Sequence, residues 1–369
     1  MQTTVGTWLT EYMSGHGRSG VKTQMVRVVL AGCGMMSADF LQAVAEIGGI
    51  DVVGLVDPAL CRAQERRSEF NLPQAAVGPD LLTMIDQEHP HAVFDIVVPL
   101  ARHRVGVIAL SHGCHLLSEK PMADSMANAR DLIRVGVSAR RIHAVVQNRR
   151  YHPGVRRIVR FLRDGHLGRL TGIYCDFFQG PHFGGFREEM QHVLLLDMAI
   201  HTFDIGRLFA DALPQSVWCR EWNPSKSWYA HGAAAIAVFE MIGGVIFSYR
   251  GSWCAEGLAT SSQSTWRITG ECGTLLWDGG DNIRAEVHEP GLSSGCKPVA
   301  VPPLDPADRV GGHRGVIEDF VNSIRTGQLP ETAASENIKS LAMVFGAIRS
   351  AETGKVSVFC EGDLARESE

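Results

Sequence analysis

The stretch that decides the fold lies near the start of the chain and reads Val26-Arg27-Val28-Val29-Leu30-Ala31-Gly32-Cys33-Gly34-Met35-Met36-Ser37. Its β-branched run ends at a glycine, which is typical of a strand that enters a tight turn. Apolar residues then recur at helical spacing, at Phe40, Leu41, Val44 and Ile47. The sequence therefore predicts a strand, a turn and a helix over residues 26–47.

The turn carries a glycine pattern typical of dinucleotide-binding sites. Gly32 permits the tight turn, Gly34 lets the backbone approach a pyrophosphate, and the following helix offers unpaired N–H groups. Ser37 stands where a third glycine is expected, and serine is small enough for close packing of the helix on the strand. A turn without a ligand is the alternative interpretation.

An acidic residue follows at the spacing expected of such a site. Asp57 ends the next apolar run, 23 residues after Gly34. A carboxylate there can accept hydrogen bonds from ribose hydroxyls and would repel a 2′-phosphate. This favours NAD over NADP as the cofactor, while Arg62 a few residues on leaves NADP open.

Strands and helices alternate up to residue 147. Further strands are predicted at 52–56, 93–98, 115–117 and 143–147, and helices at 81–87, 103–112 and 127–135. Each parallel strand needs a crossover helix, so the alternation predicts an α/β fold with a doubly wound parallel sheet of the Rossmann type.

The second half of the chain has a different pattern. A helix is predicted at 153–163, and period-2 strands at 170–178, 235–253 with a hairpin at Gly243-Gly244, 264–268 and 273–277. Closing helices are predicted at 315–325 and 336–352. We expect a polar N-terminal arm at 1–25, a dinucleotide-binding domain at 26–147 and an α+β domain with a large open, mostly antiparallel sheet at 148–369.

Composition limits the function classes. The 369 residues carry a formal charge of −5 and are 45% apolar, so a core can form and nothing marks a nucleic-acid or membrane partner. The start of the chain shows no export signal, and the nine cysteines contain no C-x-x-C pair. We therefore expect a cytoplasmic protein with free thiols. No set of ligands has zinc-site spacing, so no metal is supported.

Two clusters could carry chemistry. The first, Glu119-Lys120-Pro121, follows the strand at 115–117, so Lys120 would point into the crevice at the carboxyl ends of the strands. A surface lysine before a turn proline is the alternative. The second places Asp197, His201 and Asp204 on one helical face. Here the alternative for His201 is a core histidine with satisfied hydrogen bonds.

Other side chains near the predicted domain junction favour structural roles. Arginines recur at helical spacing without interleaved aromatic residues, which favours a solvated helix face over a nucleic-acid patch. These are Arg149, Arg150, Arg156, Arg157, Arg160 and Arg163. Trp222, Trp228 and Trp253 could stack on a sugar ring or serve in packing.

Several motifs together resemble one family. They are Gly32-Cys33-Gly34, Asp57-Pro58, Val98-Pro99 with His103, Glu119-Lys120-Pro121, Asn148-Arg149-Arg150-Tyr151-His152-Pro153, Asp197 with His201, and Trp266-Arg267-Ile268 with Gly270 and Gly273-Thr274-Leu275. Their order resembles the glucose–fructose oxidoreductase, inositol dehydrogenase and rhizopine-catabolism (Gfo/Idh/MocA) family. The resemblance runs from about residue 26 to residue 356.

The resemblance implies particular roles. The catalytic residues would be Lys120, Asp197 and His201, with Lys120 in a segment where the family often has a cis proline bond. The cofactor-binding residues would be Gly32, Gly34, Met35, Met36, Asp57, Val98, Pro99, Leu100, His103, Glu119 and Lys120. The substrate-binding residues would be Lys120, Asn148, Arg149, Asp197 and His201.

Chemistry constrains how these residues would act. Hydride removal from a carbinol carbon requires a base within reach of its hydroxyl, and His201 has the intrinsic pKa for this near neutrality. A cationic Lys120 would stabilise the developing alkoxide, unless Lys120 is itself the proton acceptor. Asp197 would orient His201 or hold a neighbouring substrate hydroxyl.

We therefore expect an NAD(P)-dependent oxidoreductase that acts on a secondary hydroxyl or ketone of a sugar, inositol or related polyol. Two alternatives are an NAD-dependent glycosidase of the same superfamily and a non-catalytic protein that senses a dinucleotide or sugar. The family resemblance also implies a homodimer or homotetramer that pairs through the C-terminal sheet.

Overall fold

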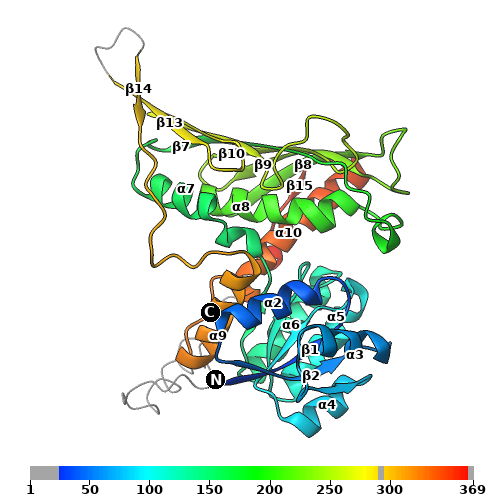
Figure 1. Ribbon diagram of the computed structural model, residues 1–369. Helices are drawn as coiled ribbons and strands as arrows, with labels where there is room; N and C mark the ends of the chain where they lie inside the picture. Colours follow the sequence, from blue (N-terminus) through cyan, green and yellow to red (C-terminus); the bar gives the residue numbers. More distant parts are fainter. Residues whose placement is uncertain (1–24, 290–294, 365–369) are drawn as a thin grey trace, which may run out of the picture. The chain divides into compact units, whose positions relative to one another are not determined.

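We describe a computed structural model of the chain, which covers residues 25–289 and 295–364 (Figure 1). The chain forms two compact units. Of the described residues, the first unit comprises 25–148 and 311–338, and the second comprises 149–289, 295–310 and 339–364. Except for Met25, the predicted arm lies outside the described residues.

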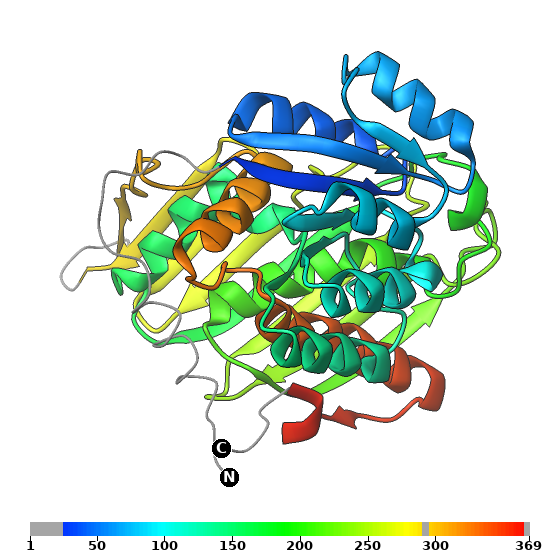
Figure 2. The ribbon, with the colours of Figure 1, turned by 90° about the horizontal axis from the view of Figure 1, so that it is seen from below.

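The first unit contains a six-stranded parallel sheet in the order β3-β2-β1-β4-β5-β6. In chain order its strands are β1 (Val26–Ala31), β2 (Ile50–Val56), β3 (Ala76–Gly78), β4 (Ala92–Asp95), β5 (His115–Ser118) and β6 (His143–Val145). Strands β1 and β2 run side by side, blue in Figure 2. The strand order reverses at β1, which leaves a crevice at the carboxyl ends of β1 and β4.

Helices flank this sheet in two layers. They are α2 (Ser37–Ile47), α3 (Leu60–Glu69), α4 (Leu81–Glu88), α5 (Pro99–Ser111), α6 (Met126–Ser138) and α9 (His313–Thr326). Right-handed crossovers place α2 and α3 on one face and α4, α5 and α6 on the other. The core joins them to the sheet: Phe94 of β4 packs against Phe40 of α2 and Phe320 of α9, with ring centroids 6.0 and 6.1 Å apart.

The chain returns to the first unit after leaving it, which differs from the expected continuous domain at 148–369. Helix α9 packs beside α2 and against β5. Its buried face includes Val316, Ile317 and Phe320, so burial of this apolar stripe against α2 accounts for the return. The next helix, α10 (Ala334–Thr353), begins in the first unit and continues in the second.

The second unit contains a nine-stranded sheet in the order β14-β13-β12-β11-β7-β10-β9-β8-β15. Its strands are β7 (Leu170–Phe178), β8 (Pro214–Trp222), β9 (Ala234–Met241), β10 (Ile246–Ser252), β11 (Thr265–Gly270), β12 (Gly273–Trp277), β13 (Ile283–His288), β14 (Cys296–Val299) and β15 (Ser357–Val358). Among the strand pairs that the structure describes in this sheet, only β7 and β10 run parallel. The predicted fold class is therefore confirmed.

Helices cover one face of this sheet, as Figure 1 shows. They are α7 (Pro153–Arg163), a π-helical turn η3 (Leu194–Ala199) that continues as α8 (Ile200–Ala210), and the second part of α10. Phe203 of α8 meets Phe239 and Tyr249 edge-on, at 4.8 and 5.2 Å between ring centroids. The core therefore lies between α8 and the sheet. The described part of the chain also has one-turn 3-10 helices at η1 (Asn148–Tyr151), η2 (Gly185–Arg187) and η4 (Glu361–Leu364).

Candidate functional site

The glycine turn after β1 has the shape that a dinucleotide needs. Gly32 has φ +98°, and a Cβ on it would lie 2.8 Å from the carbonyl group of Ile96. At Gly34 an added Cβ would meet nothing within 4 Å, so the backbone is open to a ligand there. Ser37 is buried, and its hydroxyl donates to the Gly34 carbonyl oxygen (2.6 Å). Serine thus fits the place of the third glycine by closing the turn.

The Asp57 carboxylate is tied to the same turn. It accepts hydrogen bonds from the backbone N–H groups of Cys33 (2.9 Å) and Ala59 (2.8 Å). Each carboxylate oxygen can accept a further bond, so ribose hydroxyls remain compatible with this arrangement. Burial, with Asp57 nearby, raises the pKa of the Cys33 thiol to about 12, so this cysteine stays protonated and unreactive.

An arginine that the sequence analysis missed also faces the turn. Arg66 of α3 donates to the Ser37 hydroxyl (3.0 Å) and to the Gly34 carbonyl oxygen (3.2 Å), and it pairs with Glu69. The polar sequence of α3 has a single buried residue, Ala63, and therefore no apolar stripe that could have predicted the helix. Arg62, in the first turn of α3, is exposed.

Exposed apolar side chains surround the carboxyl ends of β1 and β4. Met35, Val98 and Leu100 are 72%, 54% and 84% exposed. Pro99 begins α5, and Met36 is half-buried. Such side chains can pack against the flat rings of a dinucleotide, and together with the open turn at Gly34 they fit a bound NAD.

Arg102 binds backbone and side-chain groups at this edge of the sheet, whereas the residue predicted to bind the cofactor was its neighbour His103. The buried Arg102 side chain donates to the carbonyl oxygens of Pro121 (2.5 Å) and Val97 (2.6 Å), and it lies 3.4 Å from the Asp95 carboxylate. Burial raises the pKa of Asp95 to about 6, against the effect of Arg102. His103 instead pairs with Asp131 of α6, at 2.8 Å.

Lys120 lies two residues after the end of β5, and the Lys120–Pro121 peptide bond is cis, as the family resemblance implied. The preceding Glu119 accepts hydrogen bonds from the Lys120 N–H (3.0 Å) and pairs with His313 of α9 (3.2 Å). Burial alone would raise the pKa of Glu119, but His313, Lys120 and Arg102 outweigh it and lower the pKa. Glu119 thus joins the lysine segment to α9, which the sequence analysis placed in the other domain.

In the second unit the acidic and histidine residues do not share one regular helical face. Asp197 lies in the π-helical turn η3, whereas His201 and Asp204 lie in α8. A π-turn holds more residues per turn than an α-helix, so the expected four-residue spacing does not apply across it. All three side chains are buried.

Asp204 has a structural role. Its carboxylate accepts two hydrogen bonds from Arg150 (2.6 and 2.7 Å) and one from Ser340 (2.6 Å). Burial opposes its ionisation, but Arg150, Arg207 and Ser340 outweigh that effect, so the pKa of Asp204 lies below its ordinary value. This network anchors residue 150 and α10 to α8.

Asp197 is held by a residue outside every predicted element. Arg187 of η2 donates to its carboxylate at 2.8 Å. The Arg187 guanidinium also lies over the rings of Phe183 (5.4 Å) and Phe186 (4.9 Å). The segment Gly184-Gly185-Phe186-Arg187 offers only a glycine and aromatic composition as a signal, and it has no periodicity.

Asn148 and Arg149, predicted to grip the substrate, both have buried polar atoms without hydrogen-bond partners. The candidate sugar-stacking tryptophans have different surroundings. Trp253 is buried beside Tyr229, and Trp228 stacks on His182 at 3.7 Å. Trp222, on β8, is 42% exposed.

The arginines of α7 do not form the solvated face that we expected. Arg157 donates to the Pro302 carbonyl oxygen (2.8 Å), and Arg160 binds the Pro303 carbonyl oxygen (2.9 Å) and Asp308 (2.6 Å). They tie the extended segment before α9 to α7, because its backbone carbonyls would otherwise lack partners.

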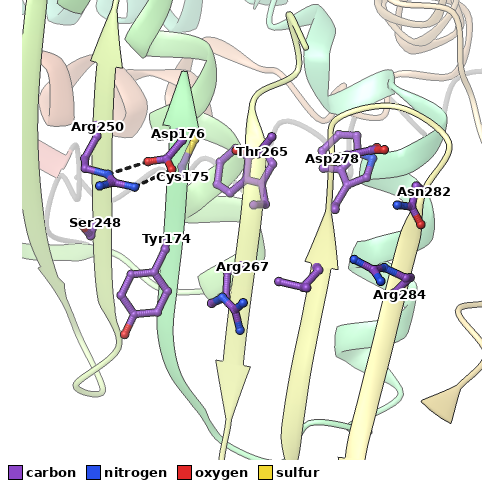
Figure 3. Close-up of a pocket in the computed structure, with 13 residues that line it drawn as sticks. Tyr174, Cys175, Asp176, Ser248, Arg250, Thr265, Arg267, Asp278, Asn282 and Arg284 are labelled. Carbon is purple, nitrogen blue, oxygen red and sulfur yellow. Dashed lines mark hydrogen bonds and ion pairs between the residues drawn. The ribbon is translucent and has the colours of Figure 1, made fainter. Parts of the chain in front are cut away.

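A further concave surface lies on the face of the second sheet that no described helix covers (Figure 3). It is an open groove of about 640 Å³ across β10, β7, β11, β12 and β13. Tyr174, Arg267 and Arg284 line it, and Arg250 pairs there with Asp176. None of the predicted catalytic residues line it.

The described residues contain no group of three or more His, Cys, Asp or Glu side chains that could hold a metal ion. Within the same residues, every helix is too short or too polar to cross a membrane.

Comparison with known proteins identifies the family. Residues 26–147 match "Oxidoreductase family, NAD-binding Rossmann fold", and residues 155–276 match the "GFO/IDH/MocA C-terminal domain". D-apiose dehydrogenase from Paraburkholderia graminis is 26% identical over 340 residues, 88% of each chain. The scyllo-inositol 2-dehydrogenase (NADP(+)) of Bacillus subtilis is 24% identical over 265 residues, which are 69% of this chain and 76% of that protein.

Solved structures share the fold. An oxidoreductase from Agrobacterium radiobacter, in complex with NAD+, L-tartaric acid and magnesium, superimposes with a TM-score of 0.80 at 18% identity. The match covers 91% of this chain and 98% of that one. The two family matches cover both halves of the chain, and they agree with the glycine turn and with the folds of the two units. The chain belongs to the Gfo/Idh/MocA family of NAD-binding oxidoreductases.

Proposed function

We propose that this oxidoreductase transfers a hydride between NAD and a secondary hydroxyl or ketone of a sugar, inositol or related polyol. The position of Lys120 carries the proposal. It follows β5 at the same carboxyl edge of the parallel sheet from which the glycine turn and Asp57 emerge. Relatives named D-apiose dehydrogenase and scyllo-inositol 2-dehydrogenase support the substrate class.

The chain's own residues would supply binding and proton transfer. Bound NAD would accept or return the hydride. The Lys120 ammonium would stabilise the oxygen that gains negative charge as the hydroxyl loses its proton, and His201 would take that proton. Asp197, oriented by Arg187, would hold His201 or a neighbouring substrate hydroxyl. An alternative assignment makes Lys120 the proton acceptor.

This proposal is tested by titrating the protein with NADH and NADPH and then assaying a panel of sugars and inositols at the nicotinamide absorbance. Nucleotide binding and substrate-dependent formation of NADH or NADPH would support it. Absence of binding to either nucleotide would contradict it at the first step. Release of a leaving group from a glycoside without net NADH would favour the glycosidase alternative.

Asp57→Ala is expected to weaken NADH binding about tenfold while weakening NADPH binding less. The carboxylate can accept ribose hydroxyls and disfavours a 2′-phosphate, and its loss also releases the Cys33 N–H. Fluorescence titration with both nucleotides measures the change. Asp86→Ala, at an exposed position of α4, serves as the control. Equal loss of affinity for both nucleotides would assign Asp57 to support of the turn alone.

We also propose that the protein is a homo-oligomer that pairs through the uncovered face of the second sheet. A row across four strands places Trp218, Val238, Ser248 and Tyr174 side by side. Trp218 and Tyr174 are 42% and 46% exposed. Exposed apolar side chains in contact with one another are typical of protein–protein interfaces.

Val238→Glu is expected to convert the oligomer to monomers, because it places a charge at the centre of this row. Light scattering coupled to size exclusion measures the mass. Gln87→Glu, on exposed α4 of the first unit, is the matched control and should leave the mass unchanged. A monomeric wild-type protein, or an unchanged mass for Val238→Glu, would contradict the assembly.

A further inference from the structure

Arg149, which is half-buried, differs from the buried arginines Arg150 and Arg207 of the second unit. Its Nη1 atom is buried without a hydrogen-bond partner. Its guanidinium lies 5.9 Å from the ring centroid of Phe177, and among the described residues it forms no ion pair. Arg150 and Arg207, by contrast, share the Asp204 carboxylate. A buried polar group without a partner is unusual in folded proteins and calls for a specific explanation.

The carboxylate that most influences Arg149 in this region is already neutralised. Asp197 lies close enough to affect the Arg149 charge, but its carboxylate is paired with Arg187 at 2.8 Å. Burial lowers the pKa of Arg149 to about 10, so the side chain stays cationic at neutral pH. Among the described residues, no carboxylate is therefore paired with the Arg149 guanidinium.

A second polar atom beside Arg149 also lacks a partner. The hydroxyl of Tyr249 is fully buried and makes no well-formed hydrogen bond. It lies near Thr202, whose own hydroxyl donates to the Ala199 carbonyl oxygen (2.9 Å). Gly251 leaves the space that this hydroxyl fills, since a Cβ there would lie 2.1 Å from it. Burial raises the pKa of Tyr249 well above its ordinary value, so the phenol keeps its proton and can donate.

The Arg149 Nη1 group and the Tyr249 hydroxyl are neighbouring donors without hydrogen-bond partners, and they fit an acceptor that carries charge. A neutral hydroxyl could accept a hydrogen bond from Arg149 but would leave its charge uncompensated, whereas a carboxylate satisfies both. We propose that the substrate is an acidic sugar or polyol, and that Arg149, with Tyr249, binds its carboxylate. This inference rests on the proposed function, because it specifies the substrate of the same site.

The test compares matched pairs that differ only in a carboxylate: D-glucuronate with D-glucose, and D-galacturonate with D-galactose. The wild-type protein is expected to prefer each acid by at least tenfold in kcat/KM. Arg149→Met should lower kcat/KM for the acids by about 100-fold or more, and by at least about tenfold more than for the neutral sugars. Arg149→Lys, which keeps the charge but not the fork of donors, should lie between them.

A second readout does not depend on turnover. In the presence of NADH, glucuronate or galacturonate should raise the Tm of the wild-type protein but not that of Arg149→Met, and the neutral sugars should have little effect on either. Arg169→Met is the matched control, because Arg169 is an exposed arginine paired with Glu271. It should behave like the wild type in both assays.

The outcomes separate this inference from the proposed function. The acid specificity would be overturned if the wild-type protein turned over neutral sugars with no preference for acids. It would also be overturned if Arg149→Met lowered kcat/KM equally for acids and neutral sugars. Either result would leave the proposed oxidoreductase function standing. Equal Tm shifts with acid and neutral ligands would also overturn the acid specificity. Failure to bind NADH or NADPH would instead remove the proposed function itself.

Discussion

Lys120→Ala is expected to lower kcat by about a thousandfold while leaving the affinity for NADH within about threefold. Lys120 follows β5 beyond the sheet, and the Lys120 N–H is bonded to the Glu119 side chain rather than to the glycine turn. Removing the ammonium therefore removes stabilisation of developing negative charge without disturbing the nucleotide-binding backbone. Steady-state kinetics and NADH fluorescence titration measure the two quantities.

The variant Lys120→Arg distinguishes the two roles proposed for Lys120, which are stabilisation of negative charge and acceptance of the proton. A guanidinium keeps the positive charge but cannot release a proton in a protein. If Lys120 stabilises charge, Lys120→Arg should retain part of the activity that Lys120→Ala loses. If Lys120 accepts the proton, both variants should be equally inactive, and His201→Asn should then cost much less than either.

Lys226→Ala, at an exposed loop position of the second unit, controls for the loss of a lysine. It should leave kcat and NADH affinity unchanged. Far-UV circular dichroism of Lys120→Ala shows whether the fold is retained. A folded Lys120→Ala protein with full activity would remove Lys120 from the chemistry and strengthen the sensing alternative.

The strand, turn and helix that carry the proposed cofactor site were predictable because the strand and the helix have periodic sequences. The strand at 26–31 has the bounds expected from its β-branched run. A tight turn after a strand predicts a glycine, and Gly32 has the positive φ of +98° that such a turn requires. Arg66 and Arg102 could not be found this way. Arg66 lies on a helix without an apolar stripe, and Arg102 acts by binding the carbonyl oxygens of Val97 and Pro121, which no local pattern encodes.

The second half was less predictable for two physical reasons. Strand β14, at one end of the sheet, is mostly exposed and carries no apolar alternation that would reveal it. Strand β13 does alternate apolar and polar residues, but it is only six residues long and was not predicted. The Asp197 segment reads as an ordinary α-helix, and only tertiary packing makes it a π-turn held by Arg187. The same limit applies to Asp204, whose spacing to His201 fits a catalytic cluster while its contacts are those of a buried ion pair.

Asp204→Asn is expected to lower the free energy of unfolding of the second unit by about 3–5 kcal/mol. Asp204 is fully buried and Arg150 is 4% exposed, so the variant would leave the Arg150 charge without its counter-ion in a region that water does not reach. Urea unfolding followed by tryptophan fluorescence measures this, because six of the seven tryptophans lie between residues 218 and 277. The midpoint should fall by roughly 1–2 M.

A second Arg–Asp ion pair, between Arg250 and Asp176, provides a matched control because it is exposed to solvent. Arg250 and Asp176 also form two hydrogen bonds (2.7 and 2.6 Å), but their side chains are 60% and 32% exposed. Exposed pairs contribute about 1 kcal/mol or less, so Asp176→Asn should shift the midpoint far less. Equal effects of the two substitutions would contradict the view that burial makes the Asp204 pair strong.

The pH dependence gives an independent check. Because the folded-state pKa of Asp204 is lowered, its contribution is complete above the unfolded value of about 3.9 and is lost as pH falls through the folded value. The gap in stability between the wild type and Asp204→Asn should therefore be constant near neutrality and narrow below about pH 4. Replacing both partners, as Arg150→Met with Asp204→Leu, should recover much of the loss, because the buried Arg150 charge is then removed together with its counter-ion. Recovery of stability in that double variant would show that Asp204 stabilises the second unit by compensating the buried Arg150 charge.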